Sequence, residues 1–163
     1  MKKILLLLLI QSLLTFTVEA GTIFLIRHAE KADDGSKNPV LTAKGTSRAN
    51  NIARMLSNAN ISKVYATDYN RTQLTAKPMA DLLGVPVLSY DPRKLEDFVK
   101  MLKQLEGNAL VVGHSNTTPQ VAALLSGQEV KTMGESDFDD IYQVTLQGEL
   151  AVVTMLKSLS YAP

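Results

Sequence analysis

The sequence predicts an α/β fold with three layers, α/β/α, and a mostly parallel central sheet. Two observations lead to this prediction. Short runs of β-branched, aromatic and other apolar residues alternate with longer segments in which apolar residues recur at helical spacing. Strand and helix follow each other four times, and two strands come last with a short glycine-containing turn between them. Strands joined by crossover helices lie parallel, and the helices then cover both faces of the sheet.

Six apolar runs are predicted as strands. Each is short and bounded by polar residues, proline or glycine, which is typical of strands in a sheet. The six runs are residues 22–26, 64–66, 85–88, 109–112, 141–146 and 150–156. The last two flank Gln147-Gly148-Glu149 and are therefore predicted to form an antiparallel hairpin.

Four segments are predicted as helices from the spacing of their apolar residues. They run from Thr42 as N-cap to about residue 58, over residues 69–83, from Pro92 at the first helical position to Gly107, and over residues 117–125. Pro78 interrupts the second helix, where we expect a kink or a restart, because proline lacks an N–H and restricts the residue before it. Gly84 is expected to end that helix.

Composition limits the chemistry that the chain can perform. The 163 residues carry 17 Lys and Arg against 16 Asp and Glu, a net charge of +1, so no basic surface predicts a nucleic-acid partner. The chain has no cysteine, which excludes disulfides, cysteine nucleophiles and cysteine-ligated metal centres. His28 and His114 are its only two histidines. We therefore expect neither a metal nor a cofactor.

The first 20 residues are predicted to be a signal peptide. Lys2 and Lys3 precede an apolar stretch, residues 4–16, and Val18-Glu19-Ala20 supplies a cleavage site after Ala20. The stretch of about 13 residues is shorter than the roughly 20 that cross a bilayer, so a retained anchor is the less favoured alternative. We expect a single domain over residues 21–163, located in the periplasm or secreted, with no stable membrane anchor after cleavage.

Charged residues follow three of the predicted parallel strands directly. Arg27 and His28 end the first strand, Asp68 and Arg71 follow the second, and His114 ends the fourth. In an open α/β sheet, ligands bind beyond the carboxyl ends of the strands. Two arginines offer forked donors that match a tetrahedral oxyanion, and an imidazole can accept a phosphoryl group. This set predicts phosphoryl transfer without a metal.

Each of these residues also has a purely structural interpretation. A histidine that ends a buried strand is often hydrogen-bonded within the protein. An arginine near a helix start often pairs with a carboxylate, and Asp68 could pair with Arg71 in this way. The combination favours function, because both histidines and two arginines fall at equivalent strand ends, and buried positive charges without an anionic ligand are costly.

These residues resemble the histidine phosphatase superfamily, which includes phosphoglycerate mutases and phosphohistidine phosphatases. The matching segments are Leu25-Ile26-Arg27-His28-Ala29-Glu30, Asn38-Pro39-Val40-Leu41-Thr42 with Gly45, Tyr65-Ala66-Thr67-Asp68 through Arg71-Thr72-Gln73-Leu74-Thr75-Ala76, and Val111-Val112-Gly113-His114. They span nearly all of residues 21–163 in the family's order. The resemblance implies a phosphoglycerate mutase-like fold. It also implies that His28 is the phosphorylated nucleophile and that Arg27, Arg71 and His114 bind the phosphoryl oxygens.

The sequence departs from the family pattern at two points. Ala29 stands where the family usually has glycine, which fits only if that backbone needs no positive φ. No carboxylic acid for the leaving group stands out, because Ser115 follows His114. Glu96 and Asp97 are interpreted as residues of a first helical turn. Glu30 and Asp34 remain candidate proton donors.

We therefore expect an exported phosphatase that hydrolyses phosphomonoesters of small molecules through a phosphohistidine on His28. One alternative is a phosphohistidine phosphatase, since compact members of the family act on a nitrogen leaving group. An alternative from another class is a non-catalytic phosphate- or anion-binding module. The segment Asp137-Phe138-Asp139-Asp140-Ile141 resembles the Asp-x-Asp of aspartyl-phosphate phosphatases, but we interpret it as a solvated loop before a strand.

Overall fold

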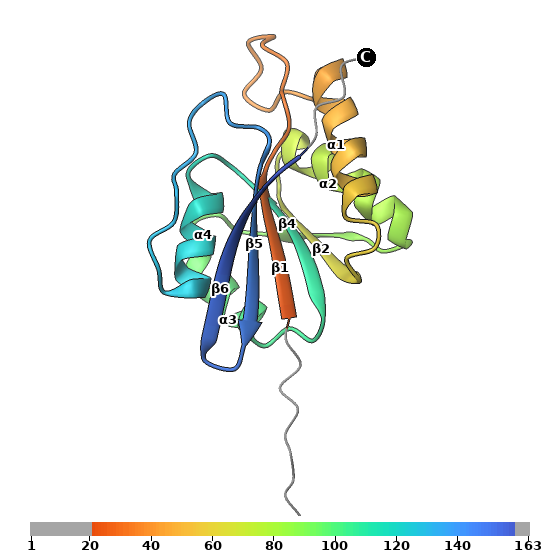
Figure 1. The fold of residues 1–163 in the computed structure, drawn as a ribbon. Helices are drawn as coiled ribbons and strands as arrows, with labels where there is room; N and C mark the ends of the chain where they lie inside the picture. Colours follow the sequence, from red (N-terminus) through yellow and green to blue (C-terminus); the bar gives the residue numbers. More distant parts are fainter. Residues whose placement is uncertain (1–20, 159–163) are drawn as a thin grey trace, which may run out of the picture.

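The computed structural model describes residues 21–158, which form one six-stranded sheet with helices on both sides (Figure 1). The strands are β1 (Gly21–Arg27), β2 (Ile61–Thr67), β3 (Val87–Tyr90), β4 (Asn108–Gly113), β5 (Asp140–Gln147) and β6 (Leu150–Lys157). The helices are α1 (Ala43–Met55), α2 (Asn70–Leu83), α3 (Leu95–Lys103) and α4 (Thr117–Ser126). The predicted signal peptide, residues 1–20, lies outside the described residues, as do residues 159–163.

The strand order in the sheet is β3-β2-β4-β1-β5-β6. The pairs β3–β2, β2–β4 and β4–β1 are parallel, whereas β1–β5 and the hairpin β5–β6 are antiparallel. The predicted α/β fold with a mostly parallel sheet and a final hairpin is therefore confirmed. The order places β4 between β1 and β2, so the carboxyl ends of the three strands that carry the predicted site lie next to one another.

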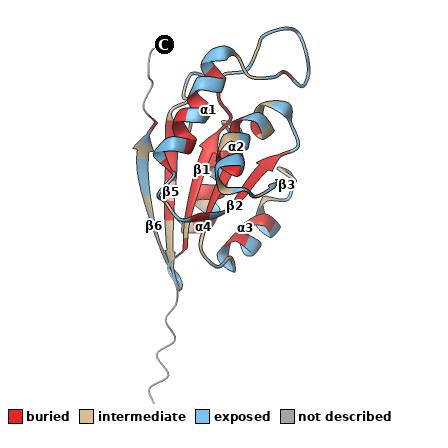
Figure 2. Cartoon of the chain, turned by 90° about the vertical axis from the view of Figure 1, so that its right-hand side faces the viewer, coloured by how far each residue is buried: buried red, intermediate tan, exposed pale blue. Residues whose placement is uncertain are grey.

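Two apolar cores form on the two faces of the sheet. Ile23 and Leu25 of β1 point into the core that α3 and α4 cover, and Phe24 and Ile26 point into the core that α1 and α2 cover. All four side chains are buried, because alternate residues of a strand face opposite sides and both sides are covered here. Figure 2 shows the buried residues concentrated in the strands and on the inner sides of the helices.

The loop after β1 is fixed to the start of α1. Thr42 is the N-cap, as predicted, and its Oγ1 accepts a hydrogen bond of 3.0 Å from the Gly45 N–H. The Thr42 N–H donates to the Glu30 carbonyl at 2.9 Å. A Cβ atom on Gly45 would lie 2.2 Å from that carbonyl oxygen, so only glycine allows the helix to approach the loop this closely.

Two details of the helices differ from the prediction. α2 continues through Pro78 without a restart. It is capped by Gly84 in the left-handed conformation, and the predicted end of this helix is confirmed. Leu74, whose carbonyl loses its helical partner at Pro78, lies on the exposed side, where water can replace the missing donor.

α3 begins at Leu95 and not at Pro92. The Asp91 carboxylate accepts a 2.9 Å hydrogen bond from the Arg93 N–H, and the Lys94 N–H donates to the Asp91 carbonyl. This side-chain turn competes with a helix over these residues and delays its start. Within residues 21–158, no helix has the length and apolar character needed to cross a membrane.

Candidate active site

The predicted residues converge at the carboxyl ends of β1, β4 and β2, at the top of Figure 1. Arg27 ends β1 opposite Gly113 of β4, and the His28 N–H donates to the Gly113 carbonyl at 2.9 Å. The rings of His28 and His114 lie edge to face with their centroids 5.6 Å apart. The structure thus brings together residues that are 86 positions apart in the sequence, 28 to 114.

His28 presents a single free ring nitrogen. Its side chain is buried, and Nδ1 lies 2.8 Å from the carbonyl oxygen of Ala29. A carbonyl only accepts, so the neutral ring carries its proton on Nδ1 and leaves the lone pair of Nε2 free. Nε2 is therefore the atom that can act as a nucleophile.

A chain of hydroxyl groups fixes the orientation of His114. The Thr72 hydroxyl donates to backbone carbonyls of Thr67 and Tyr69, so it accepts the 3.0 Å bond from the Thr67 hydroxyl. Thr67 Oγ1 has then used its only proton and must accept from His114 Nε2, which lies 2.9 Å away. The lone pair of His114 Nδ1 faces Arg71 Nη2 at 3.5 Å.

Both imidazoles are neutral at neutral pH. Burial lowers the pKa of His28 to about 4, and the nearby charges of Arg27 and Arg71 act in the same direction. Burial and the charges of the same two arginines also lower the pKa of His114 to about 4. The site therefore combines two unprotonated imidazoles with two cations.

Arg27 is held by the segment before β5, and two of its N–H groups stay free. Its Nη1 donates to the carbonyls of Gly134 and Glu135 at 2.9 Å each, and its Nη2 donates to the Glu135 carboxylate at 3.3 Å. The guanidinium also stacks on the Phe138 ring, 4.3 Å from its centroid. A guanidinium has five N–H groups, so Nε–H and one Nη2–H remain. Nε is buried without a hydrogen-bond partner.

Arg71 shows the same pattern on the other side of the histidines. Its guanidinium stacks on the Tyr69 ring at 4.5 Å, and its Nε is buried without a partner. Burial and the charge of Arg27 lower the pKa of the Arg71 guanidinium. Among the ion pairs of the described residues none joins Arg71 to Asp68, so the structural alternative for Arg71 is wrong. Two buried arginine N–H groups without acceptors define a site for an anion.

The backbone after His28 is held by a residue of α2. Thr75 Oγ1 accepts a 2.9 Å hydrogen bond from the Ala29 N–H. Ala29 is fully buried and has a negative φ, since Asn60 is the one non-glycine residue with a positive φ in the part of the chain that the structure describes. The backbone at residue 29 therefore accommodates alanine in place of the family's glycine, because it needs no positive φ.

The carboxylates considered as proton donors are engaged elsewhere. Glu30 binds Arg48 through both oxygens, at 2.7 and 2.9 Å. Partial burial raises the pKa of Glu30, but the hydrogen bonds and charge of Arg48 outweigh burial and hold this pKa below its usual value. Asp34 bonds the Ser36 N–H in the exposed loop. Glu96 and Asp97 lie in the first turn of α3, as predicted.

Residues 137–139 form a partly exposed loop before β5, as the sequence predicts, but the segment 137–141 is more buried than expected at Phe138 and Asp140. Phe138 packs on Arg27, and Asp140 is the first residue of β5, with a side chain that is 1% exposed. Lys131 and Lys157 pair with the Asp140 carboxylate at 3.1 and 2.5 Å. Asp140 is therefore a buried ion-pair residue at the start of the strand, which does not fit a phosphate-accepting Asp-x-Asp.

The sequence also missed Thr67, Glu135 and Phe138 as part of the site. Thr67 directly precedes Asp68, so inspecting the last residue of β2 as well as those after it could have found it. An aromatic residue between acidic ones was the signal available for Phe138. No signal pointed to Glu135.

Two hollows flank the cationic site. The first, of about 740 Å³, includes Ser115, Asn116, Gln120, Val130, Met133 and Glu135 in its wall, and we call it the α4 groove. The second, of about 510 Å³, lies beside Tyr69 and Arg93. Within residues 21–158, no group of three His, Asp or Glu side chains lies together as metal ligands.

Two histidines and two arginines gather at the carboxyl edge of this sheet and form a candidate site for an anion; Arg27 and His28 are buried, and Arg71 and His114 are half-buried. The sequence pattern of the family described as "Histidine phosphatase superfamily (branch 1)" matches residues 23–93, which include Arg27, His28 and Arg71. The chain is therefore similar to this superfamily over these residues, and its fold is phosphoglycerate mutase-like.

Curated relatives match part of the chain. "Probable phosphoglycerate mutase GpmB" of Enterobacter sp. (strain 638) is 35% identical over 80 residues, which are 45% of this chain and 37% of the relative. The protein of the same name from Erwinia tasmaniensis is 31% identical over 94 residues, 54% of this chain and 43% of the relative. The matched part of the chain thus spans well under half the length of these relatives.

Solved structures of low sequence identity share the fold. The structure of the protein histidine phosphatase SixA complexed with tungstate superposes with a TM-score of 0.69 at 19% sequence identity. The match covers 84% of this chain and 97% of the SixA chain. The structure of the alpha-ribazole phosphatase from Shigella flexneri has a TM-score of 0.70 at 17% sequence identity, and the match covers 84% of this chain and 96% of that protein. Both cover nearly their whole length, so the sheet and its helices match a compact member of the superfamily.

Proposed function

We propose that the chain is a phosphatase that hydrolyses phosphomonoesters of small molecules through a phosphohistidine on His28. The observation that carries this proposal is the free Nε2 of a neutral His28 beside three groups suited to bind an anion. These are the unpartnered N–H groups of Arg27 and Arg71 and the imidazole of His114.

In the first step, the phosphoryl oxygens accept hydrogen bonds from Arg27 and Arg71. His114 takes up a proton as the anion binds, because its Nδ1 then faces negative charge, and donates from Nδ1 while Nε2 donates to Thr67. The lone pair of His28 Nε2 attacks phosphorus, and the bond from phosphorus to the leaving group breaks with its electron pair on the leaving group. The Ala29 carbonyl stabilises the charge on the His28 ring through Nδ1–H.

In the second step, water attacks the phosphohistidine, the phosphorus–nitrogen bond breaks with its electron pair on Nε2, and phosphate leaves. The two hollows beside the site support hydrolysis over transfer to a second substrate molecule. A mutase must keep water away from its phosphorylated histidine, and an open site does not do this.

A phosphohistidine phosphatase is the second candidate, favoured by one observation. The fold matches SixA, a protein histidine phosphatase, over nearly the whole length of that chain. The same anion-binding groups and the same nucleophile, His28, would act on a substrate with a nitrogen leaving group. A phosphohistidine peptide and a small phosphomonoester supplied at equal concentration distinguish the two candidates by their kcat/KM values.

Export to the periplasm or the medium is a separate proposal, supported by the amino-acid pattern of residues 1–20. Expression of the full chain followed by cell fractionation and amino-terminal sequencing tests it. A mature protein that begins at Gly21 in the periplasm or medium is the expected result. Full-length protein in the cytoplasm would contradict export without affecting the proposed chemistry.

Turnover of para-nitrophenyl phosphate by the wild type and by His28→Ala tests the proposed function. We expect the variant to lose turnover and to keep binding of tungstate, because the variant lacks the nucleophile and retains Arg27, Arg71 and His114. Tungstate binding without turnover in the wild type, over a range of phosphate substrates, would instead establish a non-catalytic anion-binding module.

A further inference from the structure

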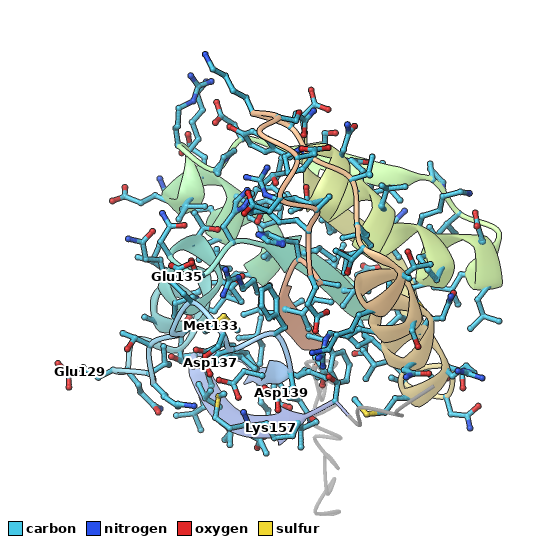
Figure 3. The ribbon with its side chains drawn as sticks, turned by 90° about the horizontal axis from the view of Figure 1, so that it is seen from above. Glu129, Met133, Glu135, Asp137, Asp139 and Lys157 are labelled. Carbon is cyan, nitrogen blue, oxygen red and sulfur yellow. The ribbon has the colours of Figure 1, made fainter. Side chains whose placement is uncertain are left out.

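Glu135 is a carboxylate that both touches the cationic site and lines the α4 groove. Its Oε2 lies 3.3 Å from Arg27 Nη2, and its side chain is 92% exposed. The same residue forms part of the wall of the α4 groove beside Ser115 and Asn116, which directly follow His114. In Figure 3, seen from above, Glu135 lies nearer the middle of the view, whereas Glu129 reaches out at its edge.

The backbone of Glu135 is held in place, and its carboxyl group is exposed. Arg27 Nη1 binds the carbonyls of Gly134 and Glu135. A tight turn supports them, because the Gly134 N–H donates to the Asp137 carboxylate at 2.8 Å and the Asp137 N–H donates to the Gly134 carbonyl at 3.2 Å. Among residues 21–158, the Glu135 carboxylate hydrogen-bonds Arg27 alone.

The acidic residues that follow Glu135 are committed to other partners, and Glu129, which also lines the α4 groove, reaches out at the edge of Figure 3. Asp137 accepts from the Gly134 N–H, Asp139 pairs with Lys157, and Asp140 pairs with Lys131 and Lys157. Glu30 is bound by Arg48. Asp68 lines the second hollow beside Tyr69, whose ring stacks on the Arg71 guanidinium.

We propose that Glu135 is the proton donor to the leaving group of a phosphomonoester whose alcohol portion lies in the α4 groove. The proposal rests on the proposed function. It assigns the chain to esters of weakly acidic alcohols, such as sugars and other polyols, because these leaving groups need a proton as the bond to phosphorus breaks.

The chemistry balances through both steps. As His28 Nε2 forms its bond to phosphorus, the bridging oxygen takes the electron pair of the breaking bond and the proton of the Glu135 carboxyl group. The resulting Glu135 carboxylate then accepts a proton from the water that attacks the phosphohistidine.

The test compares leaving groups of different acidity. Initial rates are measured for para-nitrophenyl phosphate, phenyl phosphate and glycerol phosphate with the wild type, Glu135→Gln, Asp68→Asn and Glu149→Gln. Glu135→Gln keeps the size of the side chain and an oxygen that can accept from Arg27. Glu149 is an exposed glutamate in the turn between β5 and β6, at the other end of the sheet, and controls for the loss of one charge.

We expect Glu135→Gln to lower kcat/KM for glycerol phosphate by roughly a hundredfold or more, and for para-nitrophenyl phosphate by less than about threefold. Glu149→Gln should match the wild type on all three substrates. An equal loss on all substrates would show that Glu135 only positions Arg27 and would overturn the proposal. The same holds if Asp68→Asn, and not Glu135→Gln, shows the dependence on the leaving group. Failure of the proposed function is distinguishable, because the wild type would then hydrolyse none of the three.

Discussion

Thr67 Oγ1 lies 2.9 Å from His114 Nε2, and this hydrogen bond turns the other ring nitrogen of His114 towards Arg71. Thr67 in turn donates to Thr72, so a buried pair of hydroxyl groups on β2 and α2 determines which atom of His114 faces the anion. A protonated His114 can then donate to Thr67 and to a phosphoryl oxygen at once.

Replacing Thr67 by valine should therefore weaken catalysis without removing a group that touches the substrate. We expect kcat/KM for para-nitrophenyl phosphate to fall roughly tenfold to a hundredfold, the range typical when a partner that orients a functional histidine is removed. Thr145→Val, at the opposite end of the sheet, is the matched control and should keep the wild-type value. A Thr67→Val enzyme with wild-type kcat/KM would show that this hydrogen bond does not set the orientation of His114.

The pH dependence of activity follows from the lowered pKa of His28. The free protein holds His28 neutral down to about pH 4, so kcat/KM should stay high through mildly acidic pH and fall only near that value. Initial rates at low substrate concentration across this range measure the profile. A loss of kcat/KM centred near pH 6.5, the ordinary value for histidine, would contradict a desolvated nucleophile.

Stability should depend on pH for the same reason. The folded pKa values of both histidines lie below the unfolded value, so between about pH 6.5 and 4 the unfolded chain binds more protons than the folded one. The free energy of unfolding should therefore decrease as pH falls through this window. Urea denaturation of the wild type and of His28→Gln measures the effect, and the slope against pH should be smaller in the variant. Equal slopes would mean that His28 is not held neutral in the folded state.

Phe138 should contribute to anion binding although it cannot contact the anion through a polar atom. Its ring supports the Arg27 guanidinium at 4.3 Å, and such a contact contributes about 0.5 to 2 kcal/mol. Phe138→Ala should raise the dissociation constant of tungstate by roughly threefold to thirtyfold. Phe138→Leu keeps apolar packing without the aromatic face, so its dissociation constant for tungstate should lie between those of the wild type and Phe138→Ala. Calorimetric titration that gives one affinity for all three proteins would contradict a role for this stacking.

Activity should survive chelators. Arg27 and Arg71 supply the positive charge, and no cluster of three potential ligands occurs within residues 21–158. Initial rates before and after dialysis against EDTA should agree. A loss of rate that a divalent cation restores would show that the arginines do not suffice to stabilise the phosphoryl group.

The fold and the central site residues could be predicted from the sequence for a physical reason. β1 and β4 are buried on both faces, which makes their sequences continuous apolar runs, and the topology of parallel strands brings Arg27, His28 and His114 to one edge. The periodicity of the apolar residues and the order of the elements along the chain are therefore enough to predict the sheet and the edge at which these residues meet.

The surroundings of the site could not be predicted in this way. Glu135 and Phe138 reach Arg27 across more than 100 positions of sequence, through an irregular segment whose path depends on the Gly134–Asp137 turn. The start of α3 was misplaced because a single carboxylate, Asp91, stabilises a turn over Pro92. Side-chain hydrogen bonds determine the path of this segment and the start of α3, and the pattern of apolar residues does not predict such bonds.

The covalent intermediate on His28 tests the central claim most directly. The wild type is mixed with para-nitrophenyl phosphate, unfolded in alkali within the first turnovers to preserve an acid-labile phosphoramidate, digested, and analysed by mass spectrometry. We predict a phosphoryl group on the peptide that contains His28, absent from His28→Ala and released by mild acid. Phosphate on another residue, or turnover by His28→Ala at more than a few per cent of the wild-type rate, would contradict nucleophilic catalysis by His28.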